Sequence, residues 1–307
     1  MPGAPVGGVL IVDKARGPTS HDVVGRVRRA LGIRQVGHAG TLDPMATGVL
    51  VVAVGEATKL VPWLTAQDKA YEATVALGTE TDTLDAQGRA TRSVAPGEAL
   101  IEALARSRRG AVDPLLQAAL DAERARVAQV PPAFSAIQQQ GVRAHVRARR
   151  GEHVELPPRA VRVTRLELAA CSVSPPALSV VLEVDKGYYV RSLARDLAGR
   201  LGTVGHLTAL RRTRSGSFDV SEAVSLESDL AARMVPLEEA ATRALPVARL
   251  TERGARDASC GRPVQPDDLT ETRPDPCAWL DPAGRLVAVG QRQPDGNGKV
   301  LRGFGGH

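Results

Sequence analysis

The sequence predicts an α+β fold: a mixed, mainly antiparallel sheet with flanking helices, followed by a small β-rich C-terminal domain. Short β-branched runs predict strands, but they do not alternate regularly with helices as a parallel sheet requires. Residues 245–307 are rich in Gly, Pro and Asp and contain short apolar runs such as RLVAVG. That pattern is typical of a small β domain with tight turns.

The N-terminal elements follow from local patterns. Residues 8–13 (GVLIVD) predict a buried strand, because the run is β-branched and too short for a helix. A helix is predicted over residues 21–31, with apolar side chains at helical spacing and Ser20 as its N-cap. Residues 32–48 are predicted to form a loop, and the apolar run 49–54 predicts the next strand.

Further elements follow along the chain. Residues 72–77, 161–168 and 178–184 alternate between apolar and polar residues and predict strands. Residues 190–201 (VRSLARDLAGRL) predict an amphipathic helix that ends at Gly202.

The domain organisation is predicted from changes in composition. Residues 97–130 are rich in Ala and Arg and helical in character, with a break at Gly110. The pattern changes around Leu245. We therefore expect one large domain over residues 1–244 and a small domain over residues 245–307.

The composition indicates which kinds of partner and cofactor the protein could bind. The chain has 307 residues, with 40 Lys and Arg against 34 Asp and Glu, and a net charge of +6. A basic surplus favours a polyanion such as nucleic acid, although a high genomic GC content produces the same Arg and Ala bias. Cys171, Cys260 and Cys277 are far apart and form no CxxC pair, so neither a disulfide framework nor a zinc site is indicated.

Targeting signals are not recognisable in the sequence. The N-terminus lacks a charged segment followed by a long apolar run, and no stretch reaches the roughly 18 apolar residues of a membrane span. We therefore expect a cytoplasmic protein without membrane association.

The segment most informative about chemistry is the glycine-bracketed loop GHAGTLDPMATG, residues 37–48. Asp43 is its single acid, and Pro44 restricts Asp43 to an extended conformation that can project the carboxylate from a fixed loop. Glycines permit positive φ and close approach of the backbone to a ligand. From the Asp–Pro pair alone, plain turn chemistry is the favoured explanation.

The string GHAGTLDPMATGVL resembles the catalytic signature of the TruB-type tRNA pseudouridine synthases. Further blocks of that family occur in the same order, and the resemblance covers roughly residues 8–225. The blocks are Asp13-Lys14, GPTSH (17–21), KAY (69–71), GTETDTLDAQG (78–88), QVPPAFSAI (129–137), KGYYVRSL (186–193) and LTALRR (207–212).

The resemblance implies the catalytic residues. Asp43 would be the nucleophile, and whether it attacks the uracil or its ribose stays open. Arg191 would pair with Asp43 and keep it ionised. Tyr71 would stack on the base and assist proton transfer at C5. Taken alone, Tyr71 reads as a packed strand residue and Arg191 as a solvated helix charge.

The resemblance also implies residues that bind the substrate. Tyr189 and Leu210 would line the pocket for the base. His38 would enter the T loop of tRNA and fill the space left by the flipped base, and Lys14 would support the catalytic loop. The active site would lie in a central cleft of the sheet.

The implied reaction is the isomerisation of uridine to pseudouridine at position 55, in the T loop of tRNA, after base flipping. It changes no oxidation state, so we expect no cofactor and no metal. We also expect the tRNA T-arm as partner, no obligatory protein partner and a monomer. Two alternatives are a non-catalytic tRNA chaperone and the guide-RNA-dependent branch of the superfamily, which modifies ribosomal RNA within a protein complex.

The chain departs from the family pattern at several places. Tyr188 stands where the family usually has a small residue, and Asp185 where a Ser-like residue is usual. Residues 110–126 look like an insertion near the thumb-like region that grips RNA. Residues 245–307 only loosely resemble the small RNA-binding PUA domain that often ends these proteins.

Overall fold

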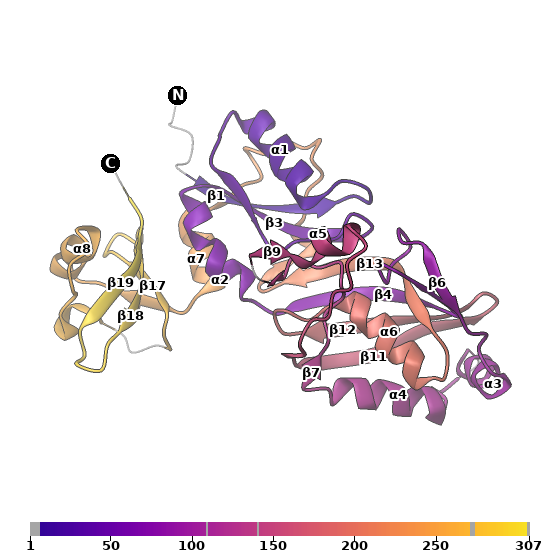
Figure 1. Ribbon diagram of the computed structural model, residues 1–307. Coiled ribbons are helices and arrows are strands. Elements are labelled where there is room, and N and C mark those ends of the chain that lie inside the picture. Colours follow the sequence, from indigo (N-terminus) through magenta and orange to yellow (C-terminus); the bar gives the residue numbers. More distant parts are fainter. Residues whose placement is uncertain (1–6, 109, 140, 271–273, 306–307) are drawn as a thin grey trace. The chain divides into compact units, whose positions relative to one another are not determined.

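The computed structural model describes residues 7–108, 110–139, 141–270 and 274–305 (Figure 1). The chain divides into two compact units by its internal contacts. Unit 1 comprises Met1–Asp43, Gly48–Gln67 and Ser215–His307, and unit 2 comprises Pro44–Thr47 and Asp68–Arg214. The chain passes from one unit to the other directly after Asp43.

The sheet of unit 1 contains the first predicted strands. Strands β1 (Gly7–Lys14), β3 (Thr47–Gly55) and β15 (Val235–Pro236) lie in the order β3-β1-β15, and β2 (Val36–Ala39) also pairs with β3. All three pairings are antiparallel. Helix α7 (Leu237–Ala244) packs on β1, and most residues of β1 and β3 are buried. Burial on both faces explains why these strands are continuous apolar runs.

Two expectations for this region are wrong. Thr19, not Ser20, caps helix α1 (Ser20–Leu31), because Thr19 and Asp22 exchange the two hydrogen bonds of a capping box. The hydroxyl of Ser20 is instead bonded to the backbone of Leu42. Residues 36–39 form strand β2 instead of a loop, because they pair with β3 through backbone hydrogen bonds. Four residues are too few for an apolar pattern that would predict this strand.

The sheet of unit 2 has the order β11-β12-β4-β13. These strands are β11 (Val163–Val173), β12 (Pro176–Val184), β4 (Lys69–Leu77) and β13 (Gly205–Ser215). β12 pairs antiparallel with both β11 and β4, so three predicted strands are confirmed. β13 was not predicted as a strand. Helix α6 (Val190–Arg200), which was predicted, packs against β4.

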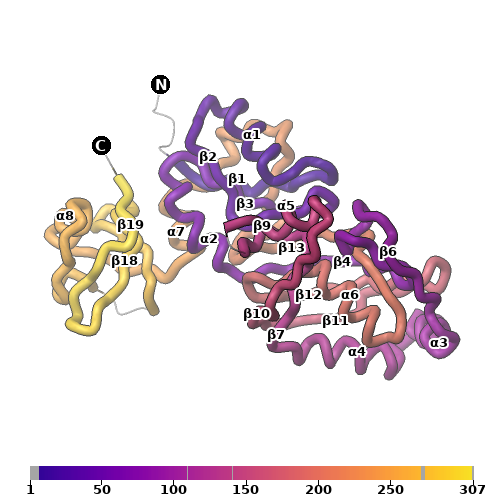
Figure 2. Tube along the Cα trace, in the orientation of Figure 1, coloured from indigo at the N-terminus to yellow at the C-terminus, as the bar shows by residue number. Residues whose placement is uncertain are grey.

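The predicted helical region with a break at Gly110 consists of α3 (Glu98–Ser107) and α4 (Pro114–Arg124). Both helices pack on β11, and α4 also contacts α6. Asp113 caps α4, and Pro114 is its first residue. Downstream, β7 (Ala128–Gln129) pairs with β10 (Arg159–Ala160), as the trace in Figure 2 shows.

The C-terminal part of unit 1 is β-rich, as predicted. Its four-stranded sheet has the order β16-β17-β18-β19 and packs with helix α8 (Glu252–Ser259), which was not predicted. Trp279 is 1% exposed and belongs to the local core. Ala278 and Leu280 instead join a cluster that includes residues of α7, so the predicted boundary at residue 245 stays a prediction. The strands are β16 (Val247–Arg249), β17 (Cys277–Leu280), β18 (Leu286–Arg292) and β19 (Gly298–Gly303).

The remaining elements are short: η1 (Glu56–Leu60), α2 (Val61–Thr65), β5 (Thr79–Thr81), β6 (Ala90–Ser93), β8 (Gln138–Gln139), β9 (Val142–Arg143), α5 (Ala144–Arg149), β14 (Phe218–Asp219), η2 (Val220–Glu222) and η3 (Pro266–Asp268). Within the described parts of the chain, no helix is long and apolar enough to cross a membrane.

The packing around Trp279 gives a test of the C-terminal sheet. A Cβ added at Gly290 would lie 2.1 Å from the indole ring of Trp279, so Gly290→Ala forces the buried ring to move. We expect a loss of about 1–3 kcal/mol in the free energy of unfolding, measured by denaturant melts. Gly303→Ala in the same sheet is the control, because its Cβ would meet no described atom within 4 Å. Equal stabilities of the two variants would contradict this packing.

Candidate active site

Asp43 lies half-buried in the loop between β2 and β3. Gly40 and Gly48 lie on either side of Asp43, with φ values of 83° and 96°. Residues other than glycine rarely adopt such backbone conformations. Leu42 and Met45 are 3% and 2% exposed, so buried side chains anchor the loop on both sides of Asp43. The loop therefore holds the carboxylate at a defined place.

The side chain of Ser20 is hydrogen-bonded to the backbone of Leu42, the residue before Asp43, and thereby braces the loop. The Ser20 hydroxyl accepts a hydrogen bond from the Leu42 N–H at 2.9 Å and donates to the Leu42 carbonyl at 3.1 Å. Ser20 is 1% exposed, so water does not replace these bonds easily. Sequence reasoning missed this role, although Ser20 lies within the matching GPTSH block.

Lys14 and His38 also belong to unit 1. Lys14 is fully buried, and its Nζ donates to the carbonyls of Ala15 and Pro18, each at 2.9 Å. It thereby fixes the turn before α1, and its backbone pairs with Gly48 at the end of the Asp43 loop. The ring of His38 packs edge-to-face on His21, with the centroids 5.3 Å apart.

Unit 2 contains the other four predicted site residues. Tyr71 on β4 is 8% exposed, and Leu210 on the neighbouring strand β13 is 7% exposed. Tyr189 directly precedes α6, and Arg191 lies in the first turn of that helix. The strand order and the packing of α6 on β4 bring the segments that carry these residues together in one unit.

The Arg191 side chain is 8% exposed, donates to two backbone carbonyls and lies near one carboxylate. Its Nη1 donates to the Thr83 carbonyl at 3.1 Å and its Nη2 to the Phe134 carbonyl at 2.9 Å. Its Nε lies 4.0 Å from the Asp85 carboxylate. The interpretation of Arg191 as a solvated helix charge is therefore wrong, and its pairing with Asp43 stays a prediction.

Asp85 is a site residue that sequence reasoning missed. It is 4% exposed, and its Oδ1 accepts from the Thr83 hydroxyl at 2.7 Å and from the Gln87 N–H at 2.9 Å. These bonds leave its other oxygen facing Arg191. Asp85 lies in the GTETDTLDAQG block, which also contains Glu80 and Asp82, so the sequence alone does not single it out.

Lys69 on β4, two residues before Tyr71, is a buried cation of this sheet, as is Arg212 on β13. Burial, together with repulsion from Arg212, lowers the pKa of Lys69 to about 8.

Among the described residues, no group of three or more His, Cys, Asp or Glu is arranged to hold a metal ion.

Comparison with known families identifies the family of this chain. Residues 28–190 match the family model of the TruB family pseudouridylate synthase N-terminal domain. Residues 191–247 match that of the tRNA pseudouridylate synthase B C-terminal domain. The chain belongs to the TruB family. It is therefore a pseudouridine synthase, and the fold class and the family resemblance are confirmed.

Relatives of the TruB family match over nearly the whole chain. The tRNA pseudouridine synthase B of Thermobifida fusca is 42% identical over 302 residues, covering 96% of this chain and 97% of its own. The enzyme of the same name from Mycobacterium tuberculosis is 44% identical and covers 92% of this chain and 91% of its own.

Solved structures show the same fold. A Cbf5–Nop10–Gar1 complex contains a chain with a TM-score of 0.67 and 24% identity, covering 93% of this chain and 78% of that one. An archaeal box H/ACA Nop10–Cbf5 complex also gives 0.67, with 22% identity and coverage of 98% and 86%. At this identity the likeness concerns the fold alone.

Ser20→Ala tests the brace on the Asp43 loop. The Leu42 N–H loses its acceptor in a buried place, so we expect a loss of about 1–3 kcal/mol in stability and about a tenfold fall in single-turnover rate. Exposed Ser228→Ala is the control. A folded Ser20→Ala enzyme that reacts within twofold of wild type would show that the brace does not orient Asp43.

Arg191→Lys tests the arrangement of two carbonyls and one carboxylate around the guanidinium. A lysine keeps the charge, but its ammonium cannot reach two carbonyls and a carboxylate with the geometry of a planar guanidinium. We expect the single-turnover rate at saturating RNA to fall by about a hundredfold. Arg162→Lys, at an exposed ion pair with Asp185, should be neutral. A folded Arg191→Lys enzyme within about threefold of wild type would reject the arrangement.

Proposed function

We propose that this enzyme isomerises the uridine at position 55, in the T loop of tRNA, to pseudouridine, with Asp43 as the nucleophile. The observation that carries the proposal is the placement of Asp43 in a braced loop within a chain of the TruB family. Full-length relatives named tRNA pseudouridine synthase B support tRNA as the substrate.

The reaction rearranges bonds without changing any oxidation state. The bond from N1 of uracil to C1′ of the ribose breaks, the base rotates, and C5 forms the new bond to C1′. The proton leaves C5, and N1 gains one. Asp43 attacks either the uracil or the ribose, and the chemistry needs no cofactor in either case.

The base must leave the RNA stack before it can rotate. In this proposal Tyr71 stacks on the flipped base and assists proton transfer at C5, while Tyr189 and Leu210 line its pocket. His38 fills the space that the base leaves in the T loop. The burial of Tyr71 and Leu210 in adjacent strands supports these roles, since an apolar wall suits a flipped base.

Two further residues would support the nucleophile. Arg191 keeps Asp43 ionised, since an adjacent cation favours the carboxylate. Lys14 supports the catalytic loop through the turn that it fixes and through its pairing opposite Gly48.

A basic segment supports an RNA partner. Arg143, Arg149 and Arg150 are exposed in and beside α5, where cations can contact phosphates. We extend the proposal to a cytoplasmic monomer without an obligatory protein partner. Residues 1–244 would be catalytic, and residues 245–307 a PUA-like RNA-binding domain.

The test is incubation with unmodified tRNA, followed by mapping of pseudouridine at single-nucleotide resolution. We expect modification at position 55 in full tRNA and in an isolated T-arm hairpin. Asp43→Asn should abolish turnover and bind tRNA within about threefold of wild type, because phosphate contacts supply most of the affinity.

Each part of the proposal has its own contrary outcome. Pseudouridine at another position would refute the T-loop assignment. Product formation by Asp43→Asn within tenfold of wild type would refute the nucleophile. Activity only on ribosomal RNA with an added guide RNA would favour the guide-dependent alternative.

A further inference from the structure

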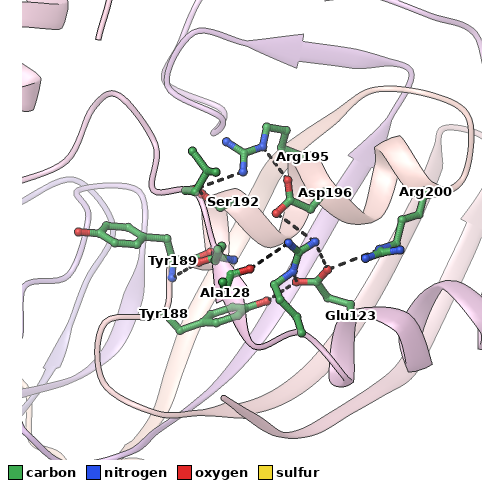
Figure 3. Close-up of polar contacts among 11 residues, drawn as sticks. Glu123, Ala128, Tyr188, Tyr189, Ser192, Arg195, Asp196 and Arg200 are labelled. Atoms are coloured by element: carbon green, nitrogen blue, oxygen red, sulfur yellow. Dashed lines mark hydrogen bonds and ion pairs between the residues drawn. The ribbon is translucent and has the colours of Figure 1, made fainter. Parts of the chain in front are cut away.

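A buried carboxylate lies outside the predicted site, at the C-terminal end of α4. Glu123 is fully buried, and its two oxygens each accept from Arg126 at 2.6 Å (Figure 3). The hydroxyl of Tyr188 donates to the same carboxylate at 3.0 Å. Burial and the negative end of the helix both oppose a carboxylate here, so these partners must offset its cost.

Arg126 extends this network toward α6. Its Nη1 donates to the Ala128 carbonyl at 3.3 Å, and its Nη2 lies 3.3 Å from Asp196. Asp196 is also paired with Arg195 at 2.7 Å. The chain directly after α4 is thereby held against α6.

Gln129 and Val130, in the same stretch of chain, are hydrogen-bonded to the start of α6. The Gln129 side-chain amide accepts from the Tyr189 N–H at 2.9 Å and donates to the Tyr189 carbonyl at 3.2 Å. The Val130 carbonyl accepts from the Ser192 hydroxyl at 2.9 Å and from Arg195 at 3.0 Å. The backbone around Tyr189 and Arg191 is therefore anchored on both sides.

The network joins two segments that are far apart in the sequence. One is the end of α4, which contains Glu123, and the other is the segment before α6, which contains Tyr188. The structure connects the two, because the Tyr188 hydroxyl reaches a carboxylate supplied by α4. Burial and the neighbouring Glu123 raise the pKa of Tyr188 well above its usual value, so Tyr188 stays a neutral donor.

We infer that Glu123 and Tyr188 are positioning residues, through which helix α4 holds Tyr189 and Arg191 in their working geometry. Glu123 fixes Tyr188 directly and fixes the backbone of Tyr189 through Arg126, Ala128 and Gln129. The inference rests on the proposed function, since it takes the roles of Tyr189 and Arg191 from there.

The test compares Tyr188→Phe and Glu123→Gln with wild type in single-turnover reactions on tRNA. Because a small displacement of a reacting group costs much rate, we expect Glu123→Gln to react about tenfold slower or more, with an RNA Kd within about twofold of wild type. Tyr188→Phe removes one hydroxyl and should be about threefold slower or more. The double variant should be slower than Glu123→Gln by less than the factor that Tyr188→Phe alone produces, because both changes act on one hydrogen-bonded network.

The matched control is Asp113→Ala at the other end of α4. It removes the N-cap and the ion pair with Arg106, so it weakens the same helix without touching the network. We expect a lower melting temperature and a rate within twofold of wild type. If Asp113→Ala and Glu123→Gln lose rate in proportion to their loss of melting temperature, the network is merely structural and the inference is wrong.

Amide hydrogen exchange gives a readout that does not need activity. Exchange of the amides of residues 189–192 should be about tenfold faster in Glu123→Gln and Tyr188→Phe, and unchanged in Asp113→Ala. Unchanged exchange and rates within twofold in both variants would overturn the inference. A wild-type enzyme inactive at position 55 would refute the proposed function alone, while exchange would still decide the inference.

Discussion

The arrangement of unit 2 depends on the buried guanidinium of Arg191. A buried arginine requires partners for its N–H groups and its charge, and this one donates to the Thr83 and Phe134 carbonyls and lies near the Asp85 carboxylate. These partners come from two segments far apart in the sequence, while Arg191 itself lies on α6. Satisfying one cation therefore forces three segments to converge, and the buried charge specifies that geometry.

The Asp43 loop in unit 1 follows the same logic. Ser20 satisfies both backbone groups of Leu42, and the buried side chains on either side of Asp43 fix the loop. In the proposed mechanism, neither set of contacts touches the substrate. Each would hold one group, Arg191 or Asp43, in place before the substrate arrives, which lowers the entropic cost of reaching the transition state.

Local patterns predicted the elements whose burial is visible in their own sequence. Strands β1 and β3 are continuous apolar runs, and α6 is amphipathic, so each was found. Strand β2 was missed because its stability comes from the ladder with β3. The family resemblance supplied Asp43 and Arg191, but not Asp85 or the bond between Tyr188 and Glu123. Those contacts join residues distant in sequence, and no periodicity or spacing encodes them.

Hydrogen exchange in an Arg191→Met variant tests the central role of this cation most directly. The methionine fills the space but leaves the Thr83 and Phe134 carbonyls without their donor. If Arg191 ties the segments together, the amides of residues 80–87 and 133–137 should lose protection together, while those of β1 in unit 1 keep theirs. Unchanged protection of both segments in the folded variant would contradict the account.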